Sequence, residues 1–162
     1  MQAIVALALI AIFDAAIAGD FPVADKVWVE KGERRLHLMR DGEPFRSFDI
    51  ALGLTPVGDK EQEGDQRTPE GTYLLDMRNP DSDFFLSIHI SYPNATDLRE
   101  ARRNGLDPGG QIMIHGQPNL PTFSAAYYAS EDWTNGCIAV SNSDMIDIWL
   151  MTPAVVPIEI TP

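Results

Sequence analysis

The sequence predicts a mainly β domain with two modest helices, and three observations support this. Short segments in which apolar and polar residues alternate recur along the chain, as at residues 26–29 and 35–39. Gly- and Pro-rich stretches separate such segments, and no fixed-period repeat or low-complexity linker divides the chain. A chain of 162 residues with 44% hydrophobic residues also suits a single core.

The individual elements follow from local patterns. Asp41-Gly42 provides a turn of positive φ after the second strand, so the first three strands form a meander that ends with residues 45–50. Residues 53–71 are rich in Gly, Pro and charge, which predicts a long exposed loop. Later strands are expected at residues 72–76, 84–91, 111–115, 137–140 and 154–160.

Two helices and a lid complete the prediction. Residues 95–104 favour a helix that ends at Gly105. A second helix follows residue 140, and either Ser143 or Asn142 is expected to cap it. The polar and aromatic residues between His115 and Trp133 predict a loop or lid with some helix.

The first 18 residues resemble an export signal. They form an apolar run that ends in Ala16-Ile17-Ala18, a small-x-small pattern of the kind that signal peptidase cuts after. We therefore expect a signal peptide at residues 1–18, a single folded domain at residues 19–162, a periplasmic or secreted location and no stable membrane span after cleavage. An uncleaved anchor or a buried N-terminal helix are the alternatives.

Charge excludes one class of partner. The chain has 24 acidic and 12 basic side chains, a formal net charge of -12, and no Lys- or Arg-rich run. Because nucleic-acid binding depends on basic patches that neutralise phosphates, no nucleic-acid partner is expected.

The single cysteine, Cys137, is the first candidate for chemistry. It cannot form an intramolecular disulfide, so it is either a small buried side chain or a nucleophile. A thiol becomes a nucleophile when an imidazole takes its proton, and His115 at a predicted strand end is the candidate base. Gly136 permits a sharp turn that would aim its N–H and that of Cys137 at an oxyanion, while the Gly116 carbonyl would orient His115 through Nδ1.

These residues together resemble a known family. His115-Gly116, then residues 117–133, then Thr134-x-Gly136-Cys137 is similar to the signature of the L,D-transpeptidase (YkuD-type) catalytic domain, in the branch without arginine two residues after the cysteine. The resemblance extends over roughly residues 25–160 and implies a β-sandwich or barrel with two short helices. Other matching segments are PVGDK at residues 56–60, GDQRTPEG at 64–71, LSIHISYP at 86–93 and Asp132-Trp133.

The resemblance implies acyl transfer on tetrapeptide stems of peptidoglycan. Cys137 would attack the L-centre carbonyl of diaminopimelate and form a thioester, with His115 as general base and acid. The acceptor would be a stem amine, giving a 3-3 cross-link, a lysine of a wall-anchored lipoprotein, or water, giving L,D-carboxypeptidase or amidase activity. No metal or organic cofactor is implied. A non-catalytic wall-binding module and a papain-like protease are the competing classes, and the segment around Cys137 lacks the pattern of the latter.

Several residues are candidate substrate contacts. Ala139 stands where many relatives of the family carry arginine, so Arg67 in the Gly-rich loop is our candidate for binding the substrate carboxylate. His89 is either a structural histidine or a contact near His115, and Asn142 has either a capping or a catalytic role. The remaining candidate contacts are Thr134, Asn135 and Trp133.

Overall fold

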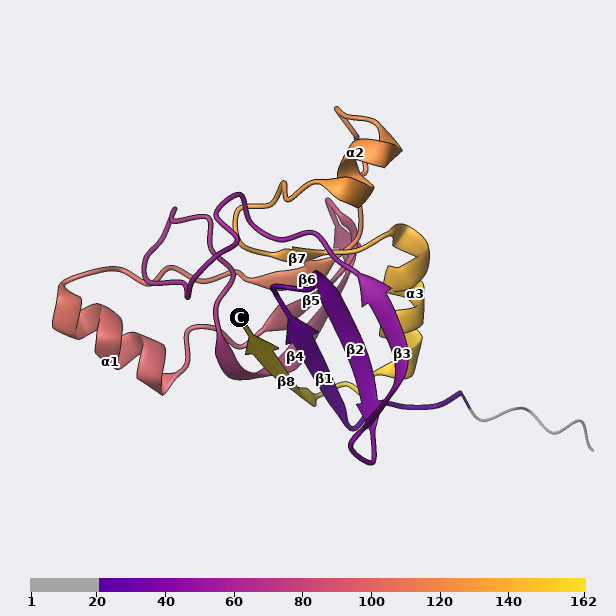
Figure 1. Cartoon of the computed structure of the whole chain (residues 1–162), viewed down its shortest axis with the longest axis horizontal. Coiled ribbons are helices and arrows are strands. Elements are labelled where there is room, and N and C mark those ends of the chain that lie inside the picture. Colours follow the sequence, from indigo (N-terminus) through magenta and orange to yellow (C-terminus); the bar gives the residue numbers. More distant parts are fainter. Residues whose placement is uncertain (1–20) are drawn as a thin grey trace, which may run out of the picture.

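A computed structural model describes residues 21–162, which form one eight-stranded sheet with three helices (Figure 1). The predicted signal peptide lies outside the described residues. The strands are β1 (Lys26–Glu30), β2 (Arg35–Arg40), β3 (Glu43–Asp49), β4 (Gly71–Ser82), β5 (Phe85–Ile90), β6 (Met113–His115), β7 (Ile138–Ala139) and β8 (Val156–Thr161). The mainly β prediction is therefore confirmed.

The sheet has the strand order β3-β2-β1-β8-β4-β5-β6-β7. Strands β1 to β3 form the expected antiparallel meander, and β1 pairs in parallel with the C-terminal strand β8. The two ends of the order approach each other at two isolated bridges, one between Gly53 and Thr134 and one where Ala51 and Ala139 exchange backbone hydrogen bonds of 2.8 and 2.9 Å. Isolated bridges do not form a continuous ladder, so the expectation of a barrel is corrected to a curled, open sheet.

The helices are α1 (Ala95–Asn104), α2 (Ala125–Ser130) and α3 (Asn142–Met151). The expected count of two is wrong, because the predicted lid contains α2, a short helix capped by Ser124. α1 matches its prediction and ends at Gly105 in the left-handed conformation. α3 is capped by Ser141, whose hydroxyl accepts the Asp144 N–H at 3.1 Å, so neither Ser143 nor Asn142 is the cap.

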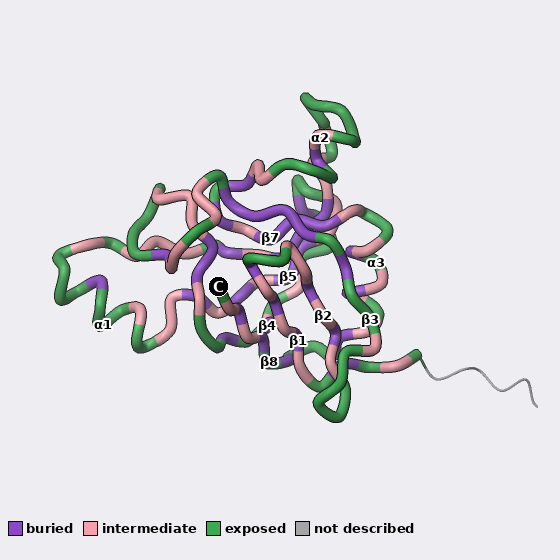
Figure 2. Tube along the Cα trace, in the orientation of Figure 1, coloured by how far each residue is buried: buried purple, intermediate pink, exposed green. Residues whose placement is uncertain are grey.

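The core is formed by alternate side chains of the central strands and by the buried side chains of α3. Each such aliphatic side chain, when fully buried, contributes roughly 1.5–3 kcal/mol. Figure 2 shows that burial is concentrated on the strands, whereas α1 and α2 are mostly exposed. Fully buried members include Val27, Val29, Leu36, Leu38, Ile158, Ile160, Met145 and Ile148.

The hairpin of β4 and β5 is longer than its pattern predicts. The sequence indicates a strand at residues 72–76, but β4 extends to Ser82. The chain then turns through residues 83–84 into β5, whose first residue, Phe85, has a φ of +68°. The outer part of β4 is mostly exposed and contains Asn79 and Pro80, residues typical of turns. Pairing with β5 overrides these local preferences, and the register shifts twice along the pair.

No helix within residues 21–162 has both the length and the apolar character required to cross a bilayer.

Candidate active site

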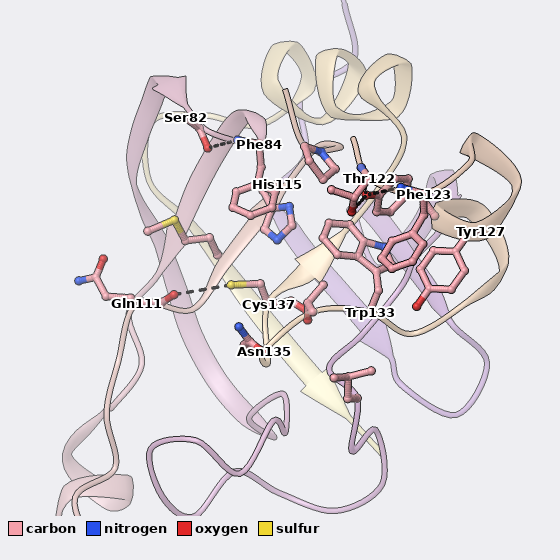
Figure 3. A pocket seen from close by; sticks show the side chains of 15 residues that line it. Ser82, Phe84, Gln111, His115, Thr122, Phe123, Tyr127, Trp133, Asn135 and Cys137 are labelled. Carbon is pink, nitrogen blue, oxygen red and sulfur yellow. Dashed lines mark hydrogen bonds between the residues drawn. The ribbon is translucent and has the colours of Figure 1, made fainter. Parts of the chain in front are cut away.

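His115 and Cys137 come from two neighbouring parallel strands. Ile114 of β6 pairs with Ile138 of β7, and both side chains are fully buried in the core. Since side chains alternate across a sheet, the next residue of β6 and the residue preceding β7 point to the opposite face. Figure 3 shows the His115 ring and the Cys137 thiol facing the same space, and both line one cavity.

The hydrogen bonding of His115 defines its tautomer. Its Nδ1 lies 2.7 Å from the Gly116 carbonyl oxygen, which only accepts, so Nδ1 carries the proton. Burial lowers the His115 pKa, and the Gly116 carbonyl partly opposes that effect. A neutral imidazole with an unprotonated Nε2 is a suitable general base.

The Cys137 thiol is half-buried and protonated at rest. Burial raises its pKa, while the Met113 backbone and the Lys60 charge act in the lowering direction. Its Sγ lies 3.6 Å from the Gln111 carbonyl, which can accept the weak S–H donor. Together with neutral His115, this arrangement favours proton transfer during reaction over a preformed thiolate and imidazolium pair.

Thr134 holds the turn that precedes the cysteine. Its buried hydroxyl donates to the Cys137 carbonyl at 2.7 Å and accepts the Gly136 N–H at 3.1 Å. The Gly136 N–H is thus engaged within the turn and would have to leave Thr134 in order to bind an oxyanion. Gly136 has a φ of +124°, and a Cβ there would lie 2.6 Å from the Arg67 carbonyl oxygen. The conformation of this turn therefore depends on glycine.

The first of two cavities at Cys137 has six aromatic side chains among its fifteen lining residues, and we call it the aromatic cavity. It has a volume of about 600 Å³. The His115 ring packs against Phe84 and Trp133, with centroid distances of 4.6 and 5.6 Å. The lid contributes Phe123 and Tyr127, whose rings stack at 4.4 Å. The lining residues are Leu54, Ser82, Phe84, Gln111, Met113, His115, Pro118, Thr122, Phe123, Tyr127, Tyr128, Trp133, Thr134, Asn135 and Cys137.

The second cavity, called here the polar cavity, reaches Cys137 from the side of the long loop. Its volume is about 470 Å³. Gln111, Asn135 and Cys137 line both cavities, so the thiol lies where the two spaces meet. The full lining is Lys60, Glu63, Gly64, Gln66, Gly109, Gly110, Gln111, Ile112, Asn135 and Cys137.

Two of the candidate substrate contacts, Arg67 and His89, lie outside both cavity linings. The Arg67 guanidinium contacts the Asp59 carbonyl at 3.3 Å and the Glu61 carboxylate at 3.4 Å. His89 Nδ1 lies 2.7 Å from the carboxylate of Asp76. The structure thus brings together Cys137, His115, Trp133, Thr134 and Asn135, with Gly116 and Gly136 beside them, but not the side chains of Arg67 or His89.

Sequence reasoning missed Lys60, a buried cation in the wall of the polar cavity. Its Nζ donates to the Asp65 carboxylate at 2.8 Å and to the Gln62 carbonyl at 3.0 Å. Burial acts to raise the Asp65 pKa, but Lys60 and several backbone N–H donors outweigh it and leave that pKa below its usual value. A Lys and an Asp in one Gly-rich loop were the available signal, although such residues are usually solvent-exposed.

A second buried lysine anchors the same loop to the sheet. Lys31 Nζ donates to the Gly58 and Thr68 carbonyls at 2.6 and 2.9 Å and to the Glu70 carboxylate at 2.8 Å. All three ammonium donors are satisfied, so the charge is compensated despite its burial. The loop is therefore held in one position against the cysteine turn.

Arg34 connects the β1–β2 turn to the end of the lid. Its guanidinium binds the Asp132 carboxylate through contacts of 2.7 to 3.1 Å, and Asp132 also accepts the Leu52 N–H at 2.8 Å. Asp132 directly precedes Trp133. This ion pair fixes the point where the lid rejoins the site.

Within residues 21–162, no group of three or more His, Cys, Asp or Glu side chains is arranged to hold a metal ion.

Residues 24–160 match the L,D-transpeptidase catalytic domain (YkuD) family, and the chain belongs to this family. The resemblance predicted from the sequence is confirmed. Among curated relatives, the Escherichia coli (strain K12) protein YafK, an L,D-transpeptidase by name, is 34% identical over 96 residues. That match covers 56% of this chain and 37% of the relative, so the chain spans little more than a third of that protein's length.

Solved structures share the fold. The helical cell shape determining protein Pgp2 from Campylobacter jejuni has a TM-score of 0.63 and 28% identity, covering 83% of this chain and 46% of that chain. An L,D-transpeptidase from Xylanimonas cellulosilytica has a TM-score of 0.52 and 19% identity, covering 86% of this chain and 61% of that chain. At 19% identity the second likeness concerns the fold alone.

Proposed function

We propose that this protein is a cysteine acyltransferase that acts on the tetrapeptide stems of peptidoglycan. The observation that carries the proposal is the position of Cys137, beside a histidine of defined tautomer and at the meeting point of two cavities. A transferase needs separate spaces for an acyl donor and an acceptor around one nucleophile. Membership of the L,D-transpeptidase family supports the same reaction.

The first half-reaction forms a thioester. His115 Nε2 takes the Cys137 proton as Sγ attacks the L-centre carbonyl of diaminopimelate in the donor stem. The tetrahedral intermediate collapses, the bond to the terminal D-alanine breaks, and His115 returns the proton to the leaving amine. The Gly116 carbonyl stabilises the imidazolium that forms between these steps.

The oxyanion of this intermediate requires N–H donors. We assign the Cys137 amide to this role, and the Gly136 amide would join it by exchanging its Thr134 partner for the oxyanion. The substrate carboxylate would be bound in the polar cavity. Lys60 is better placed for it than Arg67, because Lys60 lines that cavity and has one ammonium donor beyond its two contacts.

The second half-reaction decides the product. An amine of another stem would give a 3-3 cross-link, and a lipoprotein lysine would give a wall attachment. Hydrolysis is the alternative, because the half-exposed thiol opens to a polar cavity of about 470 Å³ that water can enter. The same thioester would then give L,D-carboxypeptidase activity or release of a wall-linked lipoprotein.

The substrate also defines the location that we propose, which is the periplasm or the outside of the cell, where peptidoglycan lies. Cleavage after Ala18 is part of this proposal. Mass measurement of the mature N-terminus tests it, and an intact Met1 would contradict it.

Mass spectrometry of the protein incubated with a defined disaccharide-tetrapeptide tests the reaction, with a Cys137→Ala variant as control. Loss of D-alanine together with a 3-3 dimer supports transpeptidation, and tripeptide without dimer supports hydrolysis. An unchanged substrate with a reactive thiol points to a lipoprotein-linked substrate. An unchanged substrate with an unreactive thiol rejects the enzyme and favours a wall-binding module.

A further inference from the structure

Asn142 is the first residue of α3 and lies beside the segment that carries His115. Its Oδ1 accepts the backbone N–H of Gln117 at 2.7 Å. Ser141 caps α3, so the Asn142 side chain is not required for capping. Its side-chain oxygen instead accepts a hydrogen bond from the backbone two residues after His115, the candidate base.

This hydrogen bond and the one that orients His115 are made to the same peptide group. The carbonyl of Gly116 and the N–H of Gln117 are its two ends. The carbonyl accepts from His115 Nδ1 at 2.7 Å, and the N–H donates to Asn142 at 2.7 Å. An unbroken hydrogen-bonded path therefore runs from the Asn142 amide oxygen through one peptide to the imidazole.

The peptide also has little freedom to move. The Gly116 N–H donates to the carbonyls of Phe84 and Leu86 at 3.0 and 3.2 Å. A Cβ at Gly116 would lie 2.6 Å from Asn142 Oδ1 and 3.0 Å from the Phe85 Cβ. Only glycine lets Asn142 approach this closely.

We propose that Asn142 is a positioning residue that acts on His115 through the Gly116–Gln117 peptide. Hydrogen bonds in a chain polarise one another, so an acceptor on the N–H makes the carbonyl a stronger partner for His115 Nδ1–H. That favours the imidazolium formed when His115 takes the cysteine proton. Asn142 thus orients the histidine through this peptide, whereas in Ser-His-Asp triads a carboxylate orients the histidine directly. The inference rests on the proposed function of His115 as base.

The pH dependence of Cys137 alkylation by iodoacetamide tests the inference, because it requires no peptidoglycan. Asn142→Leu keeps the size but removes the acceptor, and Asn142→Asp keeps an acceptor with more negative charge. Ser143→Ala, also in the first turn of α3, is the matched control. Besides Cys137, the other titratable residues lining the aromatic cavity are Tyr127 and Tyr128, and Lys60 acts on Cys137 from the polar side.

Alkylation near neutral pH should be about 3- to 10-fold slower in Asn142→Leu, the loss expected for one hydrogen bond of ordinary strength. Asn142→Asp should react at least as fast as the wild type. By NMR titration, the His115 pKa should fall in Asn142→Leu and rise in Asn142→Asp. Equal slowing in both variants, or an unchanged His115 titration in Asn142→Asp, overturns the inference. Failure on tetrapeptide with these shifts intact would instead reject the proposed function.

Discussion

Replacement of Gly136 by alanine should disrupt the cysteine turn, because this glycine meets two independent constraints. Its φ of +124° is rarely adopted by residues with a Cβ, and the new Cβ would lie 2.6 Å from the Arg67 carbonyl oxygen. That carbonyl belongs to the backbone of a loop anchored by Lys31 and Lys60. The obstacle therefore cannot rotate away as a flexible side chain would.

The two constraints allow the loss of stability in Gly136→Ala to be estimated. Backbone strain at such a position costs about 1–3 kcal/mol, and a forced contact in a packed region costs about another 1–3 kcal/mol. A total near 4 kcal/mol lowers the melting temperature of a domain of this size by roughly 8–16 °C. Gly64 provides the matched control, because its φ is +79° and an added Cβ meets nothing within 4 Å. Gly64→Ala should cost only about 1 kcal/mol, or roughly 2–4 °C.

Thermal unfolding followed by circular dichroism measures both variants, and iodoacetamide labelling of Cys137 reports the site. Gly136→Ala should melt well below Gly64→Ala and should also label abnormally, since the turn carries the thiol. If both variants melt within two or so degrees of each other and label at the wild-type rate, the reasoning from steric contact is refuted.

Burial raises the Cys137 pKa and lowers that of His115, so thiol alkylation should keep accelerating above about pH 8.5, where an unperturbed thiol levels off. An acid-side plateau, typical of a preformed ion pair, would contradict this. Lys60→Met should destabilise the fold by about 1.5–3 kcal/mol in urea unfolding, since the partly buried Asp65 would lose its charged partner and keep only its backbone N–H donors. Adding Asp65→Asn should restore most of that loss, and an equally unstable double variant would argue against the pair. Tyr128→Phe removes a hydroxyl that binds lid N–H groups and should speed limited proteolysis within the lid at least several-fold, whereas an unchanged rate would mean that those bonds do not hold it.

Strands with one buried face were predictable from the sequence, while those defined by tertiary pairing were not. Alternation at residues 26–29 and 35–39 matches the observed burial of β1 and β2 closely, because period two directly reflects which face packs on the core. The outer half of β4 carries no such signal, since it is mostly exposed and its residues favour turns. The approach of the two ends of the sheet at Ala51 and Ala139 depends on how far the whole sheet curls, which no local segment encodes.

The placement of Cys137 and His115 at one site was predictable, but their surroundings were not. A thiol and an imidazole are candidates for chemistry by residue type, and the glycines beside Cys137 and His115 indicate where the backbone bends. The direction of a long side chain in an irregular loop is different, because no repeating backbone geometry determines which of the neighbouring loop residues it meets. Arg67 therefore turned toward Glu61, while Lys60, seven positions earlier in the same loop, lines the cavity at the thiol.

The two buried lysines and two glycines explain how an irregular loop can support a precise site. Lys31 and Lys60 satisfy backbone carbonyls and carboxylates that a regular element would satisfy by itself. With the loop fixed, its carbonyls press against Gly53 and Gly136, where a Cβ would lie 2.0 and 2.6 Å from backbone oxygen. Because Lys31 anchors the loop to the sheet, these close contacts fix the position of the cysteine turn relative to the sheet. Stabilising the ion pairs of Lys31 and Lys60 should therefore make the Cys137 thiol more rigid. Weakening these pairs should make the thiol more mobile and its alkylation rate more variable before the sheet unfolds.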